Sequence, residues 1–182
     1  MRLFALLPLF LLLIACQTPG PLDENSPFRF PPPGSRLALK QELTIPAHSA
    51  GVLLQSGRVT GREDLNQYHP HCRLEVNDVR DTTQTVTPDE FLVRRAQQEV
   101  RIVAQPAIMK AGLGVASDTQ SFYVFRTILG LHSPRQPQVR WLTCQRWIYP
   151  ALGQHLSIRE IRQTLAEIFT LLLPAATPGD RQ

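Results

Sequence analysis

Residues 121–132, SFYVFRTILGLH, decide the fold because they describe a β-strand that is apolar on both faces. Side chains alternate between the two faces of a strand. One face carries Tyr123, Phe125, Thr127, Leu129 and Leu131, and the other carries Phe122, Val124 and Ile128 with the charge of Arg126. A strand of this kind needs a cover on each side, so the sequence predicts a central strand of a sheet on which another element packs.

The natural cover is the stretch at 156–173, LSIREIRQTLAEIFTLLL. Ser157 and Glu160 have the spacing of a capping box, in which a hydroxyl and a carboxylate satisfy amide groups at the start of a helix. Apolar residues then recur at helical spacing: Ile158, Ile161, Leu165, Ile168, Phe169 and Leu172. We therefore predict one amphipathic helix that begins after Ser157, packs on the sheet and is ended by Pro174.

Alternating apolar residues predict the remaining strands. They lie at 37–45, at 71–79, at 90–96 and 99–105 on either side of Gln97-Gln98, and at 138–147, with two short strands at 50–60 that turn at Ser56-Gly57. The predicted fold class is mostly β (α+β): an antiparallel sandwich or partly open barrel with one C-terminal helix, in a single domain at 36–174. The glycines in 106–120 favour a mobile loop or a short helix, and the tail at 175–182 is expected to be disordered.

The amino terminus has the pattern of an export signal. Met1-Arg2 is followed by residues 3–14, which are all apolar except for Pro8. This run is too short for a membrane-spanning helix, which takes about 20 residues. It fits the apolar core of a secretory signal, typically about 7 to 15 residues behind a basic start. Residues 1–15 are therefore predicted to be a signal peptide.

Residues Leu13-Ile14-Ala15-Cys16 at the end of this run resemble the lipobox of bacterial lipoproteins. The resemblance covers about the first 20 residues. It implies cleavage after Ala15, a diacylglyceryl thioether on Cys16 and acylation of the new amino group. Gln17 in place of aspartate implies an outer-membrane location, with the domain facing the periplasm. An unmodified thiol in an uncleaved signal is the alternative.

Residues 17–35, QTPGPLDENSPFRFPPPGS, are rich in Pro, Gly and polar residues and show no apolar periodicity. With Cys16 they are predicted to form a disordered tether at 16–35. At about 3.1 Å per residue in a polyproline conformation, this tether reaches up to about 60 Å from the lipid surface.

Two cysteines remain after Cys16, and both are placed in an oxidising compartment by the predicted export. Cys72 shares a strand face with Leu74 and Val76, and Cys144 shares one with Leu142. We predict a Cys72–Cys144 disulfide that ties an early strand to the last one. Free buried thiols or a metal site are the alternatives.

The densest group of metal-type ligands is His69, His71 and Cys72. Imidazole and thiolate suit zinc or copper. However, strand alternation directs His71 away from Cys72, and no second ligand pair follows at a zinc-site spacing. We expect turn and surface histidines here, with no metal and no cofactor; His69 and His71 are the weak candidates for a metal site.

No catalytic motif is present. The chain has no G-x-S-x-G elbow, no H-E-x-x-H helix and no Walker loop. His48 and Ser49 are adjacent, but neighbours on a strand point to opposite faces. Asp89 and Glu90 follow Pro88 in a turn context, where we expect carboxylates that are solvated or lie near the amino end of a helix. We predict no catalytic residues and no enzymatic activity.

The formal net charge is +4, and loss of residues 1–15 removes Arg2 and no acid, which leaves +3. Of the 19 basic residues 17 are arginine, whose planar guanidinium suits phosphate and carboxylate groups. An envelope location excludes nucleic acid as the partner. The expected partners are the membrane through Cys16, and an envelope protein, an anionic glycan or lipopolysaccharide.

These features predict a lipid-anchored envelope protein that acts as a non-enzymatic binding or structural module at the outer membrane. The alternatives are an envelope hydrolase or cell-wall-modifying enzyme, and a periplasmic copper or zinc binder.

Overall fold

The computed structural model describes residues 23–104 and 121–175 of the chain. Its strands are β1 (Arg36–Leu39), β2 (Leu43–Ile45), β3 (Gly51–Gln55), β4 (Arg58–Thr60), β5 (His71–Val76), β6 (Gln84–Val86), β7 (Glu90–Ala104), β8 (Ser121–His132), β9 (Val139–Ile148) and β10 (Phe169–Leu172). The helices are η2 (Pro150–Leu152), a 3₁₀ turn, and α1 (Ile158–Leu165). The predicted signal peptide, Cys16, the segment at 106–120 and the tail beyond Ala175 lie outside the described residues.

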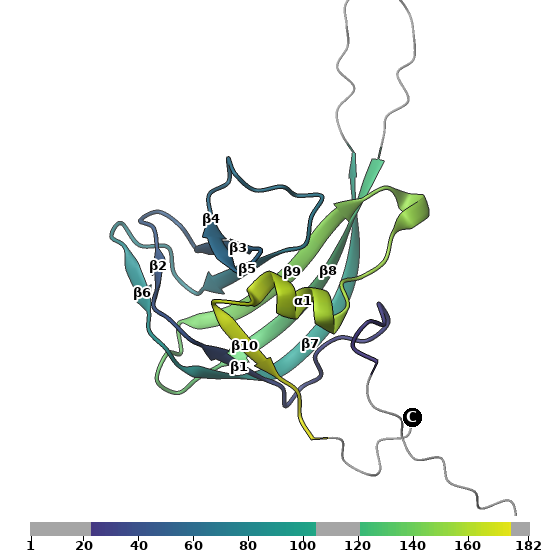
Figure 1. Ribbon diagram of the computed structural model, residues 1–182. Coiled ribbons are helices and arrows are strands. Elements are labelled where there is room, and N and C mark those ends of the chain that lie inside the picture. Colours follow the sequence, from purple (N-terminus) through teal and green to yellow (C-terminus); the bar gives the residue numbers. More distant parts are fainter. Residues whose placement is uncertain (1–22, 105–120, 176–182) are drawn as a thin grey trace, which may run out of the picture.

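Eight strands form one antiparallel sheet in the order β10-β1-β7-β8-β9-β5-β3-β4, and β2 pairs with β6 in a separate ribbon. Figure 1 shows the large sheet curving into a half-barrel with α1 lying across its concave side. The predicted fold class is therefore confirmed as a mostly β, partly open barrel with one helix near the carboxyl end. Within the described part of the chain, no helix combines the length and the apolar character needed to cross a bilayer.

The hydrophobic core lies between the concave side of the sheet and α1. Leu129 of β8, Leu142 of β9 and Leu74 of β5 are fully buried on this side, and so are Ile161 and Leu165 of the helix. Burying one such side chain stabilises the fold by about 1.5 to 3 kcal/mol. As expected, α1 therefore covers one of the two apolar faces of the strand at 121–132.

The other face of β8 is covered by aromatic side chains. Phe122 is buried among the rings of Tyr68 (centroids 5.5 Å apart), Tyr149 (4.8 Å) and Trp147 (6.4 Å). The amide of Trp147 donates a hydrogen bond to the carbonyl of Gln67, which holds the segment before β5 against this face (2.9 Å). The second cover is thus a loop with aromatic side chains.

The predicted helix is correct at its start and wrong in its length. Ser157 accepts a hydrogen bond from the Glu160 amide (3.2 Å), and the Glu160 carboxylate accepts one from the Ser157 amide (2.9 Å). The helix ends at Leu165, and Phe169–Leu172 form β10, which pairs with β1. Phe169 and Leu171 are buried while Thr170 and Leu172 are exposed, which is strand alternation. Leu172, predicted to lie on the buried face of the helix, is therefore exposed, and Leu171 is buried instead.

Replacing Ser157 with alanine is expected to lower the free energy of unfolding by about 1 kcal/mol, because the helix start loses its capping oxygen. Glu160 would also be less well held for its ion pair with Arg146 of β9, now 2.8 Å. Chemical denaturation measures the change. Gln163→Ala, at an exposed position of the same helix, is the matched control; an equal loss in both variants would contradict the role of the cap.

Two strand predictions are wrong in their boundaries. The stretch 37–45 is not one strand: β1 and β2 belong to different sheets, and the break falls where the Lys40 amide donates to the carbonyl of Ile168 (2.9 Å). The stretches 90–96 and 99–105 are instead one continuous strand, β7. Gln97 and Gln98 pair with Ile128 and Thr127 of β8, since glutamine keeps both backbone hydrogen-bonding groups and does not break a strand.

The described part of the predicted tether, residues 23–35, lies against the domain. Glu24 accepts a hydrogen bond from the Arg159 amide through its carbonyl (3.0 Å) and forms an ion pair with Arg162 (2.9 Å). Ser35 is fully buried, and its hydroxyl donates to the carbonyl of Pro32 (2.6 Å). The Glu24 contacts attach the segment to α1, and a hydrogen bond from the Gly34 amide to the carbonyl of Val93 (2.8 Å) attaches its end to β7.

Candidate functional site

Cys72 and Cys144 form a disulfide, as predicted. They lie directly opposite each other on the neighbouring strands β5 and β9, and both are fully buried. Alternation places them on the concave, apolar side, which is the face predicted for Cys72. β9 is not the last strand, because β10 follows it, so the bridge joins two central strands of the sheet.

His71 is a buried side chain, 2 % exposed, which contradicts the expected surface position, whereas His69 is exposed. The His71 Nδ1 atom donates to the carbonyl of His69 (2.9 Å), and Nε2 accepts from the Gln145 amide (3.1 Å). This is the pattern of a neutral imidazole. Burial lowers the pKa of His71, and the His69 carbonyl offsets only part of that effect.

Both ring nitrogens of His71 are therefore engaged, and its side chain projects to the face opposite Cys72. Across the described ranges, no three His, Cys, Asp or Glu side chains gather in the way that a metal site requires. The structure does not bring His69, His71 and Cys72 together as a ligand set.

Polar side chains form a row across four strands on the convex face. Glu99 of β7, Arg126 of β8, Gln145 of β9 and His71 of β5 occupy successive register positions. Arg126 donates to Glu99 at 2.6 Å, and Arg101 donates to the same oxygen at 3.0 Å. A carboxylate shared by two guanidinium groups is held in position by charge-assisted hydrogen bonds, so this row supports the sheet.

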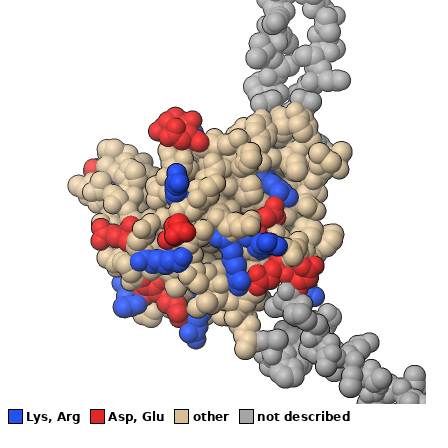
Figure 2. Space-filling view, in the orientation of Figure 1, with Lys and Arg blue, Asp and Glu red and all other residues tan. Residues whose placement is uncertain are grey.

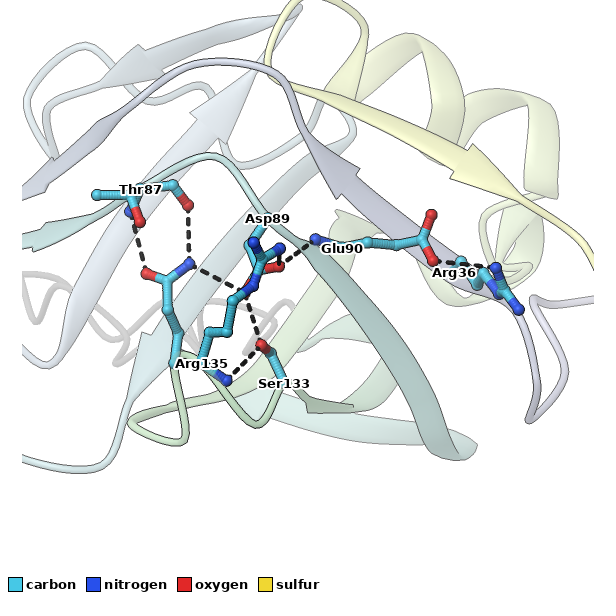
Figure 3. Close-up of polar contacts among 7 residues, drawn as sticks. Arg36, Thr87, Asp89, Glu90, Ser133 and Arg135 are labelled. Carbon is cyan, nitrogen blue, oxygen red and sulfur yellow. Dashed lines mark hydrogen bonds and ion pairs between the residues drawn. The ribbon is translucent and has the colours of Figure 1, made fainter.

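Asp89 is the centre of the most extensive polar cluster, although the sequence predicts a solvated carboxylate there. Its side chain is only 3 % exposed. It accepts hydrogen bonds from the Ser133 hydroxyl (2.6 Å), the Glu90 amide (2.7 Å), the Gln136 amide group (3.3 Å) and the Arg135 guanidinium. Figure 3 shows Ser133 and Arg135, from the turn that follows β8, converging on Asp89.

The cluster fastens two loops that are far apart in the sequence. The Gln136 side chain also donates to the carbonyl of Thr87 (2.8 Å) and accepts from its amide (3.0 Å), so the β8–β9 turn is bonded to the β6–β7 turn (Figure 3). Burial raises the pKa of Asp89, but the hydrogen bonds from Ser133, Arg135, Glu90 and Gln136 outweigh it and hold that pKa below its ordinary value.

Asp89 is poorly suited to act as a base toward Ser133. A carboxylate with a lowered pKa is a weak base near neutral pH, and here its lone pairs are used by several donors. In the adjacent pair His48 and Ser49, each side chain has a different partner: His48 is exposed 3.5 Å from Asp81, and the Ser49 hydroxyl donates to the carbonyl of Gly51 (2.6 Å).

A pocket of about 490 Å³ lies at the β4 edge of the sheet. Its walls come from β2, β3, β4, the segment after β4 and β5, and its lining includes Thr44, Pro46, Leu53, Val59, Arg62 and Arg73. Sequence analysis did not identify this pocket. Only Arg73 had a visible signal, because it alternates with Cys72 and therefore faces away from the core.

These features define a disulfide-bonded antiparallel half-barrel domain in which Asp89, Glu99 and Glu160 are each paired with an arginine. On the face seen in Figure 2, basic and acidic side chains lie next to one another. The chain matches no protein-family model, no curated protein and no solved structure.

Proposed function

We propose that the chain is a lipid-anchored protein of the cell envelope, held at the outer membrane by Cys16, and that its β domain is a non-enzymatic binding or structural module facing the periplasm. The observation that carries this proposal is the apolar run of residues 3–14 followed by Ala15-Cys16. The disulfide supports it, because a Cys72–Cys144 bridge suits an oxidising compartment and leaves Cys16 as the one cysteine of three outside the pair.

The contacts of Glu24 limit the distance between the β domain and the proposed lipid anchor at Cys16. Asp23 follows Cys16 by seven residues, and a fully extended chain of this length spans at most about 25 Å. The tether estimate of about 60 Å is too long for this arrangement, because Glu24 is already bonded to α1. The domain would therefore sit close to the lipid surface.

A non-enzymatic role is supported by how the acidic groups are used. Asp89, Glu99 and Glu160 each form an ion pair with an arginine. Such carboxylates stabilise loops, strands and a helix start. We propose an envelope protein or an anionic glycan, including lipopolysaccharide, as the partner class. Reproducible hydrolysis of cell-wall or lipopolysaccharide fragments by the purified chain would overturn this part of the proposal.

Mass spectrometry of the chain purified from its own membranes tests the anchor. We expect the first residue to be Cys16, carrying a diacylglyceryl group on its sulfur and an acyl group on its nitrogen. Cys16→Ala removes the sulfur that accepts the lipid, so this variant is expected to keep residues 1–15 and carry no lipid mass. An unmodified Cys16 in the wild-type chain, or an intact leader, would contradict the proposal.

A further inference from the structure

The pocket at the β4 edge combines two kinds of surface. Leu53, Val59 and Pro46 are apolar residues of its lining, and Arg62 and Arg73 are basic residues of the same lining. Val59 is a large apolar side chain that is 49 % exposed. The volume of about 490 Å³ is in the range of small-molecule sites, which run from about 300 to 1,000 Å³.

Arg73 is held in place at the pocket. Its neighbours in the register are Leu53 of β3 and Thr143 of β9, so the side chain stands on the convex face of the sheet. Its Nε atom lies 3.3 Å from Glu75, and its side chain is 36 % exposed. A guanidinium has five N–H groups in a planar fork, so one contact through Nε leaves donors for a second anion.

Arg62 is the second cation of the pocket, and it is exposed. Among the described residues it forms no ion pair, whereas Arg73 has Glu75 as its partner. Glu63 lies on the rim, because its carboxylate is close to Gly61. Two acidic side chains, Glu75 and Glu63, therefore lie near the pocket. The residues that line the pocket include two arginines and no acid.

We infer that this pocket binds a small organic anion, a phosphate or carboxylate attached to an apolar body. A purely apolar ligand would leave the guanidinium of Arg73 without a new partner, and inorganic phosphate would leave Leu53 and Val59 uncovered. Charge-assisted bonds from the arginine fork hold the anionic group, and the apolar walls bury the remainder of the ligand.

This inference gives the proposed binding module a ligand class, but it does not require the lipid anchor. Pocket binding is therefore measured separately from the mass of Cys16. The purified full chain is titrated with fluorophenyl phosphate, and binding is followed by fluorine NMR. Fluorobenzyl alcohol, which lacks the charge, and inorganic phosphate, which lacks the ring, are run in parallel.

We expect saturable binding of fluorophenyl phosphate and much weaker binding of the two partial ligands. Arg73→Gln and Arg62→Gln should each weaken binding about tenfold, which corresponds to about 1.4 kcal/mol. Arg94→Gln, at an exposed position of β7 away from the pocket, is the matched control and should bind like the wild type. Thermal unfolding of all three variants checks that each is folded.

Competing vesicles identify the source of the anion. Displacement of the probe by vesicles containing phosphatidic acid, but not by phosphatidylcholine alone, would assign the pocket to a membrane lipid phosphate. Binding that neither vesicle disturbs would assign it to a soluble anion. The inference is overturned if the wild-type chain shows no saturable binding, or if Arg73→Gln and Arg94→Gln bind the probe equally well.

Discussion

Replacing Cys72 and Cys144 together with alanine is expected to lower the free energy of unfolding by about 4 kcal/mol. The bridge joins residues 72 positions apart, and a closed loop of that length restricts the unfolded chain by about this amount in the chain-entropy model. Both sulfur atoms are also fully buried in the core. Urea denaturation followed by circular dichroism measures the difference.

The wild-type chain under reducing conditions is the control for this prediction. Dithiothreitol should shift its unfolding toward that of the double variant, and the double variant should not respond to the reductant. A loss of less than about 1 kcal/mol, the mean effect of an ordinary point mutation, would show that the bridge contributes little to the stability of the half-barrel.

Asp89→Asn is expected to lower the free energy of unfolding by about 3 kcal/mol. The change removes the charge that strengthens the hydrogen bonds from Ser133 and Arg135, and it turns a donor toward groups that are themselves donors. Hydrogen bonds to a charged group contribute about 1.5 to 3 kcal/mol each, and a buried group without a partner adds a further cost.

Glu90→Gln is the matched control, because Glu90 is the next residue and also forms an ion pair. Its partner is Arg36 at 3.1 Å, and the two side chains are 46 % and 60 % exposed. An exposed pair contributes up to about 1 kcal/mol. Equal losses in Asp89→Asn and Glu90→Gln would contradict the role assigned to the buried cluster.

The same carboxylate makes stability depend on pH. The pKa of Asp89 is lowered in the folded chain, so the unfolded chain binds a proton at a higher pH than the folded chain does. The contribution of Asp89 is therefore complete above the ordinary aspartate pKa of about 3.9 and is lost as the pH falls through the lower, folded value. The stability of Asp89→Asn should fall less steeply with acid than that of the wild type.

Much of the fold was predictable because its signals are local. The alternation around Leu129 and Leu131 identifies the central strand, Ser157 and Glu160 identify the helix start, and the parity of Cys72 places it in the core. Ser56 and Gly57 were predicted to form a turn, and both have positive φ, 51° and 76°, in the two-residue connection between β3 and β4.

The errors arose where a residue's partner is remote in the sequence. Asp89 is buried because Ser133, Arg135 and Gln136 come to it across 44 to 47 positions, and nothing near Asp89 indicates this. The apolar residues of Phe169–Leu172 fit the spacing of a helix and also that of a strand. The segment forms a strand because the edge of β1 offers it a pairing partner. The pocket likewise depends on β2 and β4 lying near each other, which no local pattern predicts.

The pairing of β1 with β10 also determines when the sheet can be completed during synthesis. β10 ends at Leu172 in a chain of 182 residues, yet it completes the edge of the sheet beside the first strand, as Figure 1 shows. During synthesis the amino-terminal part emerges first, so β1 gains β10 as its neighbour only after Leu172 has been made. Until then one edge of β1 has no strand to pair with, and the eight-stranded sheet remains incomplete on that side.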